Sequence, residues 1–131
     1  MVERAVEVLL RLPRVRAVVR VTQPHVRGRD PVALTYWDDR NNVLDDGIAT
    51  TDVWLRHSHN GASTWAPEQH LYGPFNHYTA PISFFAPGVP RGLFLGDYMG
   101  LETLAGDDVI NFFTSTISDG ADVHSIRANH P

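Results

Sequence analysis

The first residues whose types and spacing suggest chemistry are Asp38, Asp39 and Arg40, which follow an apolar run. They end a predicted strand and begin a polar loop, where binding residues tend to concentrate. A guanidinium holds a carboxylate through two parallel hydrogen bonds, so Arg40 is a candidate ligand for an acidic substrate. The aspartates are weak candidate Ca²⁺ ligands, because this cation prefers oxygen. The preferred interpretation is an ion pair within the loop, which orders residues 38–47.

Two histidines suggest a second kind of site. His57 and His59 lie two residues apart, and residues at this spacing on a strand share one face. Such a pair could bind a metal, but the sequence spacing supplies no third ligand. We therefore prefer a solvated pair without a metal, and we predict no cofactor.

The elements that position these residues include a hairpin. Residues 51–57 largely alternate polar and apolar side chains, and residues 67–72 can return as a second strand. Between them lies the segment Ser58-His59-Asn60-Gly61-Ala62-Ser63-Thr64-Trp65. Ser58 and Asn60 can bond to local backbone, and Gly61 tolerates a positive φ. Trp65 can anchor the loop by burying its ring.

Short runs separated by turn signals predict an all-β, antiparallel fold. An amphipathic pattern over residues 1–12 also allows a short N-terminal helix, ended by Pro13. Residues 73–91 hold four prolines and are expected to be an irregular loop. The other expected strands are 22–26, 32–38, 92–101, 108–116 and 123–127.

Composition limits the function. The 131 residues carry a net charge of −4 and have a pI of about 5.9, so nucleic acid is not an expected partner. All 11 basic residues are arginine, and cysteine is absent, which excludes disulfides and Cys-ligated metal sites. No apolar run approaches the ~20 residues of a membrane span. The N-terminal residues do not read as a signal peptide, and no membrane partner is expected.

The segment 58–65 resembles the Asp-box, or BNR repeat, of sialidases and related β-propellers. Ser58, Thr64 and Trp65 match its pattern, while Asn60 replaces the usual Asp and Ala62 replaces the usual Gly. In that family the box is structural, and it forms the turn between the third and fourth strands of a propeller blade. The resemblance thus implies a structural role for this loop.

Longer phrases extend the resemblance over about residues 22–127. Residues 32–42, 51–55 and the box look like one blade of bacterial six-bladed sialidases, and residues 92–101 look like the inner strand of the last blade. The implied organisation is an unmatched segment 1–20, a blade over 21–73, a Pro-rich inter-blade loop over 74–91 and an incomplete last blade over 92–131. About two blades of an incomplete ring are expected.

The resemblance also implies catalytic residues. Sialidases use a tyrosine nucleophile on the inner strand of the last blade, and Tyr98 has a comparable place, with Asp97 beside it. Arg40 is the candidate ligand of the substrate carboxylate. Adjacent strand residues face opposite sides, so Asp97 and Tyr98 cannot both point inward without a bulge. The alternative is that Tyr98 packs between blades and Asp97 caps a turn.

Three functions remain open. The first is a fragment of a glycoside hydrolase of the exo-sialidase type, which acts on glycans and is inactive as this chain alone, because the arginine triad and the acid/base Asp lie in earlier blades. The second is a non-catalytic propeller module that binds glycan or protein. The third is a truncated product without independent function. Expected partners are a glycan or small-molecule substrate, further propeller blades or a second copy. The family is often secreted or found at the cell surface, but localisation is not predicted.

Overall fold

The computed structural model describes residues 15–22, 32–96, 99–104, 108–117 and 120–129. The expected helix over residues 1–12 and the expected strand residues 23–26 lie outside this part of the chain. Within it, the fold is all-β and antiparallel, and it contains a single turn of 3-10 helix. The prediction of an all-β antiparallel fold is therefore confirmed.

The first sheet has four strands in the order of the sequence, β1-β2-β3-β4. Each strand pairs antiparallel with the next, and the β2–β3 register runs without a bulge from Val32↔Ser58 to Asp38↔Asp52. The strands are β1 (Val15–Thr22), β2 (Val32–Asp38), β3 (Thr50–Ser58) and β4 (Gln69–Asn76). β1 begins earlier than the strand expected at 22–26, and the proposed boundary at residue 21 cuts through it.

A second sheet repeats the pattern with three strands, in the order β7-β8-β9. Its strands are β7 (Gly100–Thr103), β8 (Val109–Ser115) and β9 (Asp122–Ala128). β8 and β9 agree with the strands expected at 108–116 and 123–127, whereas only the end of the run 92–101 belongs to β7. Among the described residues, none of the sheets closes on itself.

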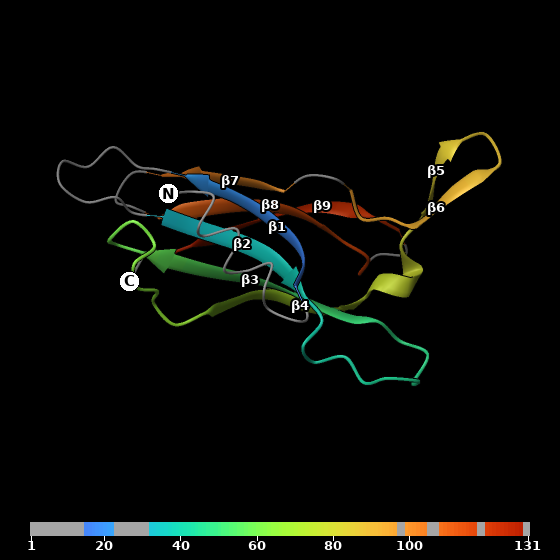
Figure 1. Ribbon diagram of the computed structural model, residues 1–131, viewed down its shortest axis with the longest axis horizontal. Coiled ribbons are helices and arrows are strands. Elements are labelled where there is room, and N and C mark those ends of the chain that lie inside the picture. Colours follow the sequence, from blue (N-terminus) through green and yellow to red (C-terminus); the bar gives the residue numbers. More distant parts are fainter. Residues whose placement is uncertain (1–14, 23–31, 97–98, 105–107, 118–119, 130–131) are drawn as a thin grey trace.

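The segment 73–91 is not irregular, so that prediction was wrong. β4 continues to Asn76, and a 3-10 turn (His77–Thr79) follows it. A two-stranded hairpin then forms from β5 (Ile82–Ala86) and β6 (Val89–Leu93). Pro90 is accommodated because each strand of this hairpin has an open edge, which needs no N–H donor. The hairpin projects away from the two larger sheets (Figure 1).

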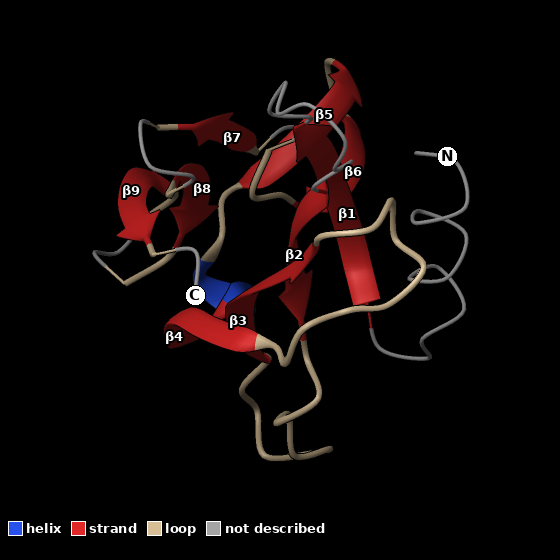
Figure 2. Ribbon diagram, turned by 90° about the vertical axis from the view of Figure 1, so that its left-hand side faces the viewer, coloured by secondary structure: helices blue, strands red, loops and turns tan. Residues whose placement is uncertain are grey.

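The two larger sheets lie face to face and enclose the core (Figure 2). Alternation along β2 and β3 directs Trp37, Val53 and Leu55 toward the second sheet. The second sheet contributes Phe113 to the cluster that contains Trp37 and Val53, and Leu101 to the cluster that contains Leu55. Burial of these side chains on both inner faces is the main attraction between the sheets.

Equivalent strands of the two sheets lie opposite one another and run in the same direction. Asn111 Nδ2 of β8 donates to Thr35 Oγ1 of β2 at 2.7 Å. Further along both strands, Trp37 Nε1 donates to the backbone oxygen of Thr114 at 3.2 Å. β1 also contacts β7, and the ring of Tyr72 in β4 lies 5.1 Å from that of His124 in β9. The second sheet therefore stacks on the first with the same strand order.

Candidate functional site

The loop between β3 and β4 is held by hydrogen bonds among its own residues. Asn60 Oδ1 accepts from the Thr64 N–H at 2.9 Å and from Ser58 Oγ at 3.0 Å. Asn60 Nδ2 donates to Thr64 Oγ1 at 2.9 Å. Ser58 Oγ accepts in turn from the Ala62 N–H at 3.0 Å. One amide side chain thus ties the start of the loop to its end.

The backbone of this loop and its tryptophan complete the turn. Gly61 and Ala62 both have positive φ, 65° and 66°. The Ala66 N–H bonds to the His57 oxygen at 2.9 Å and closes the base of the loop. Trp65 is half-buried and packs against the cluster formed by Leu34 and Tyr36, as the sequence predicted for an anchoring ring.

The predicted ion pair after β2 is present and is larger than expected. The Arg40 guanidinium donates to Asp38 Oδ2 from Nε at 2.9 Å and from Nη2 at 2.6 Å. Its Nη1 pairs with Glu68 Oε2, and Tyr36 donates its hydroxyl to Glu68 Oε1 at 2.7 Å. Arg40 is thus shared by two carboxylates, and its role as a ligand for a substrate carboxylate stays a prediction.

The protonation of this cluster follows from its contacts. Hydrogen bonds from Arg40 hold the pKa of Glu68 below its ordinary value, against the opposing effect of burial. Burial, together with the bond to Glu68, raises the pKa of the Tyr36 hydroxyl. Hydrogen bonds to Asp38 and Glu68 raise the pKa of Arg40 further. Glu68 is therefore an anion, and Tyr36 and Arg40 keep their protons.

The histidine pair and the Ca²⁺ candidates give less. His57 is buried, with 3% of its surface exposed, so the prediction of a solvated pair was wrong for this residue. Its ring lies 5.1 Å from that of His59, edge to face. In the described ranges, no group of three or more His, Cys, Asp or Glu side chains could hold a metal ion. The oxygens of Asp38 are already engaged with Arg40.

The candidate nucleophile lies outside the described residues. Tyr98 and Asp97 fall in the gap between Gly96 and Met99, and their catalytic roles stay predictions. Met99 is buried in the core beside Trp37 and Phe113, so the chain on one side of this gap is anchored between the sheets.

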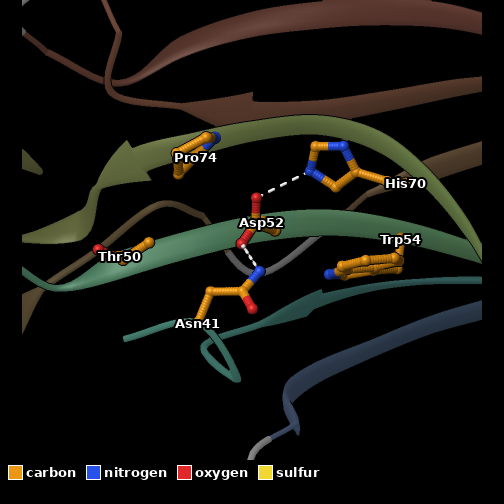
Figure 3. Close-up of a pocket in the computed structure, with 6 residues that line it drawn as sticks. All are labelled: Asn41, Thr50, Asp52, Trp54, His70 and Pro74. Atoms are coloured by element: carbon orange, nitrogen blue, oxygen red, sulfur yellow. Dashed lines mark hydrogen bonds and ion pairs between the residues drawn. The ribbon is translucent and has the colours of Figure 1, made fainter. Parts of the chain in front are cut away.

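The described residues do contain a polar groove that the sequence did not reveal. Its cavity of about 460 Å³ lies over β3, β4 and the β2–β3 loop. Asp52, only 1% exposed, accepts from Asn41 Nδ2 at 3.0 Å and lies 2.8 Å from His70 Nε2 (Figure 3). The lining residues are Asn41, Thr50, Asp52, Trp54, His70 and Pro74.

Local structure explains how the groove residues meet. Asp52 and Trp54 share the face of β3 opposite to Val53, and the β3–β4 pairing sets Trp54 opposite His70. The backbone at Gly73 passes so close that an added Cβ would lie 2.6 Å from Asp52 Oδ1. Alternation in residues 51–57 could have predicted the Asp52 and Trp54 face, but no local signal pointed to His70.

Comparisons with known proteins add no family assignment. No family model matches the chain, and no curated protein or solved structure is similar to it. Of the residues described, no helix has the length and apolar character needed to cross a membrane.

Proposed function

We propose that this chain supplies two consecutive blades of a sialidase-like β-propeller. The observation that carries the proposal is the position of the Asp-box-like loop. It joins β3 to β4, the third and fourth strands of a four-stranded antiparallel meander, which is where the family has it. Its internal hydrogen bonds use Asn60 in the place of the usual Asp.

The stacking of the two sheets supports the same proposal. Successive blades of a propeller are related by rotation about its axis, so equivalent strands run in the same direction and innermost strands are neighbours. The pairs Thr35–Asn111 and Trp37–Thr114 give β2 and β8 a common direction, and β1 contacts β7. β1 and β7 would then line the central channel, while β4 and β9 would lie at the rim.

The complete propeller would be a glycoside hydrolase of the exo-sialidase type. Tyr98 would be the nucleophile and Asp97 its neighbouring carboxylate, in the segment that precedes β7. The remaining blades, with the other arginines and the acid/base residue, come from outside these 131 residues. The chain alone is therefore expected to be inactive on sialosides.

A second candidate function is a non-catalytic propeller that binds glycan or protein. One observation favours it: the guanidinium of Arg40 is engaged by Asp38 and Glu68, so it is not arranged to receive a substrate carboxylate.

A fluorogenic sialoside assay separates the two. The assembled protein should release the fluorophore, and Tyr98→Phe should abolish the release while leaving the far-UV circular dichroism unchanged. Tyr78→Phe, an exposed tyrosine of the 3-10 turn, is the matched control. An assembled, folded protein without activity, or activity unaffected by Tyr98→Phe, would refute the catalytic proposal and favour the binding module.

A further inference from the structure

The groove over β3 and β4 has the size and the composition of a small-ligand site. Its volume of about 460 Å³ falls within the ~300–1,000 Å³ common for ligand pockets. It is lined by rings as well as by polar groups, because Trp54, His70 and Pro74 lie around the carboxylate of Asp52. None of these residues takes part in the proposed sialidase chemistry.

The polar groups of the groove are set in fixed roles. A carboxylate can only accept, so the His70 nitrogen that faces Asp52, Nε2, carries hydrogen, and the neutral ring keeps Nδ1 as an acceptor. Asn41 turns its Nδ2 toward Asp52, which leaves its Oδ1 as a second acceptor. Asp52 is buried and therefore orients both partners without moving itself.

One donor in the groove lacks a partner. Trp54 Nε1 is buried and has no hydrogen-bond partner among the residues described. Buried donors are nearly always satisfied, so an orphan points to a missing acceptor. In Figure 3 the nitrogen end of the Trp54 ring is directed toward Asn41 and Asp52, into the groove. An acceptor oxygen of a bound molecule would satisfy it.

We propose that this groove binds a neutral sugar residue. A pyranose carries hydroxyls that both donate and accept, so one ring can donate to His70 Nδ1 and Asn41 Oδ1 while it accepts from Trp54 Nε1. Its C–H faces suit the surfaces of the Trp54 ring and Pro74. The buried carboxylate of Asp52 disfavours an acidic sugar, because the nearby Arg40 is already neutralised by two carboxylates.

This site is separate from the proposed catalytic centre. The groove lies over β3 and β4, which would be the outer strands of a blade, and so it faces the rim and not the central channel. The inference therefore does not depend on Tyr98 or on the hydrolase proposal, and it can fail or succeed independently of them.

The test is saturation-transfer NMR on the full chain with the methyl glycosides of galactose, glucose and mannose, followed by titration to obtain dissociation constants. At least one glycoside should bind, and N-acetylneuraminic acid should bind at least tenfold more weakly. Trp54→Phe keeps the aromatic ring but removes the orphan donor, and it should weaken binding about tenfold. Trp65→Phe, which alters an indole of the β3–β4 loop instead, is the matched control and should leave binding unchanged.

Two results would overturn the inference. The first is that none of the three glycosides gives a transfer signal at millimolar concentration while the chain is folded by circular dichroism. The second is that a glycoside binds equally well to the native chain and to Trp54→Phe. His70→Gln is an independent variant, because it replaces the Nδ1 acceptor without touching Trp54, and it should also weaken binding.

Discussion

Replacing Asn60 by alanine tests whether the Asp-box-like loop holds the β3–β4 hairpin. Asn60→Ala removes three hydrogen bonds, to the Thr64 N–H, to Thr64 Oγ1 and from Ser58 Oγ. Each contributes a net ~0.5–1.5 kcal/mol, which sums to about 1.5–4.5 kcal/mol. Thr64 is exposed and can bond to water instead, so we expect about 2 kcal/mol in the free energy of unfolding.

The matched control is Asn60→Asp, the residue usual in the family. A carboxylate keeps the acceptor for the Thr64 N–H and for Ser58 Oγ, and the Thr64 hydroxyl can rotate to donate to the second oxygen. We therefore expect a change within about 1 kcal/mol of the native protein, since one hydrogen bond is exchanged for another.

Urea denaturation followed by far-UV circular dichroism measures both variants. With a slope of roughly 2 kcal/mol per molar urea, the loss in Asn60→Ala lowers the midpoint by about 1 M. Equal midpoints for the alanine and the aspartate variants would refute the reasoning, because the side-chain hydrogen bonds would then contribute nothing measurable.

Three further predictions concern the same sheet. Ala62→Gly should raise the free energy of unfolding by up to about 1 kcal/mol in the same urea assay, because alanine at φ 66° costs ~1–2 kcal/mol and the added freedom of glycine in the unfolded chain offsets part of this gain; lower stability would contradict the assigned backbone. Gly73→Ala should cost about 3 kcal/mol, since its Cβ would meet Asp52 Oδ1 at 2.6 Å, whereas Gly47→Ala, at φ 78° with no atom within 4 Å, should cost only about 1 kcal/mol, and similar losses would rule out the close approach. The lowered pKa of Glu68 stabilises the folded state above the ordinary glutamate pKa of about 4.5, and this contribution is lost as the pH falls through the folded pKa; the acid side of a stability–pH curve should therefore be shallower in Glu68→Gln, and an unchanged slope would contradict the pairing with Arg40.

The sequence predicted the parts of the fold that depend on local patterns. Alternation in residues 51–57 correctly indicated a strand, with Val53 and Leu55 facing the core. The hydrogen bonds of Ser58 and Asn60 also follow from local chemistry, since the partners lie within a few residues. The ion pair of Arg40 with Asp38 is local in the same sense, and it was predicted.

The features that the sequence did not predict depend on tertiary contacts. Glu68 meets Arg40 from 28 residues away, and His70 meets Asp52 from 18 residues away, so neither pair leaves a local signal. The hairpin of β5 and β6 was missed because four prolines were taken to exclude strands, although proline is compatible with an edge strand. His57 was expected in solvent, but its position in β3 buries it.

The mass of the purified chain in solution tests the central claim most directly. Two blades leave sheet faces and strand edges bare, so the chain should not persist as a folded monomer. Multi-angle light scattering, with circular dichroism on the same sample, should give a β-rich assembly of three times the 14.6 kDa chain mass, the number of copies that completes a six-bladed ring. A stable, folded and monodisperse 14.6 kDa monomer would contradict the account, because the two sheets would then be a self-sufficient sandwich and not part of a propeller.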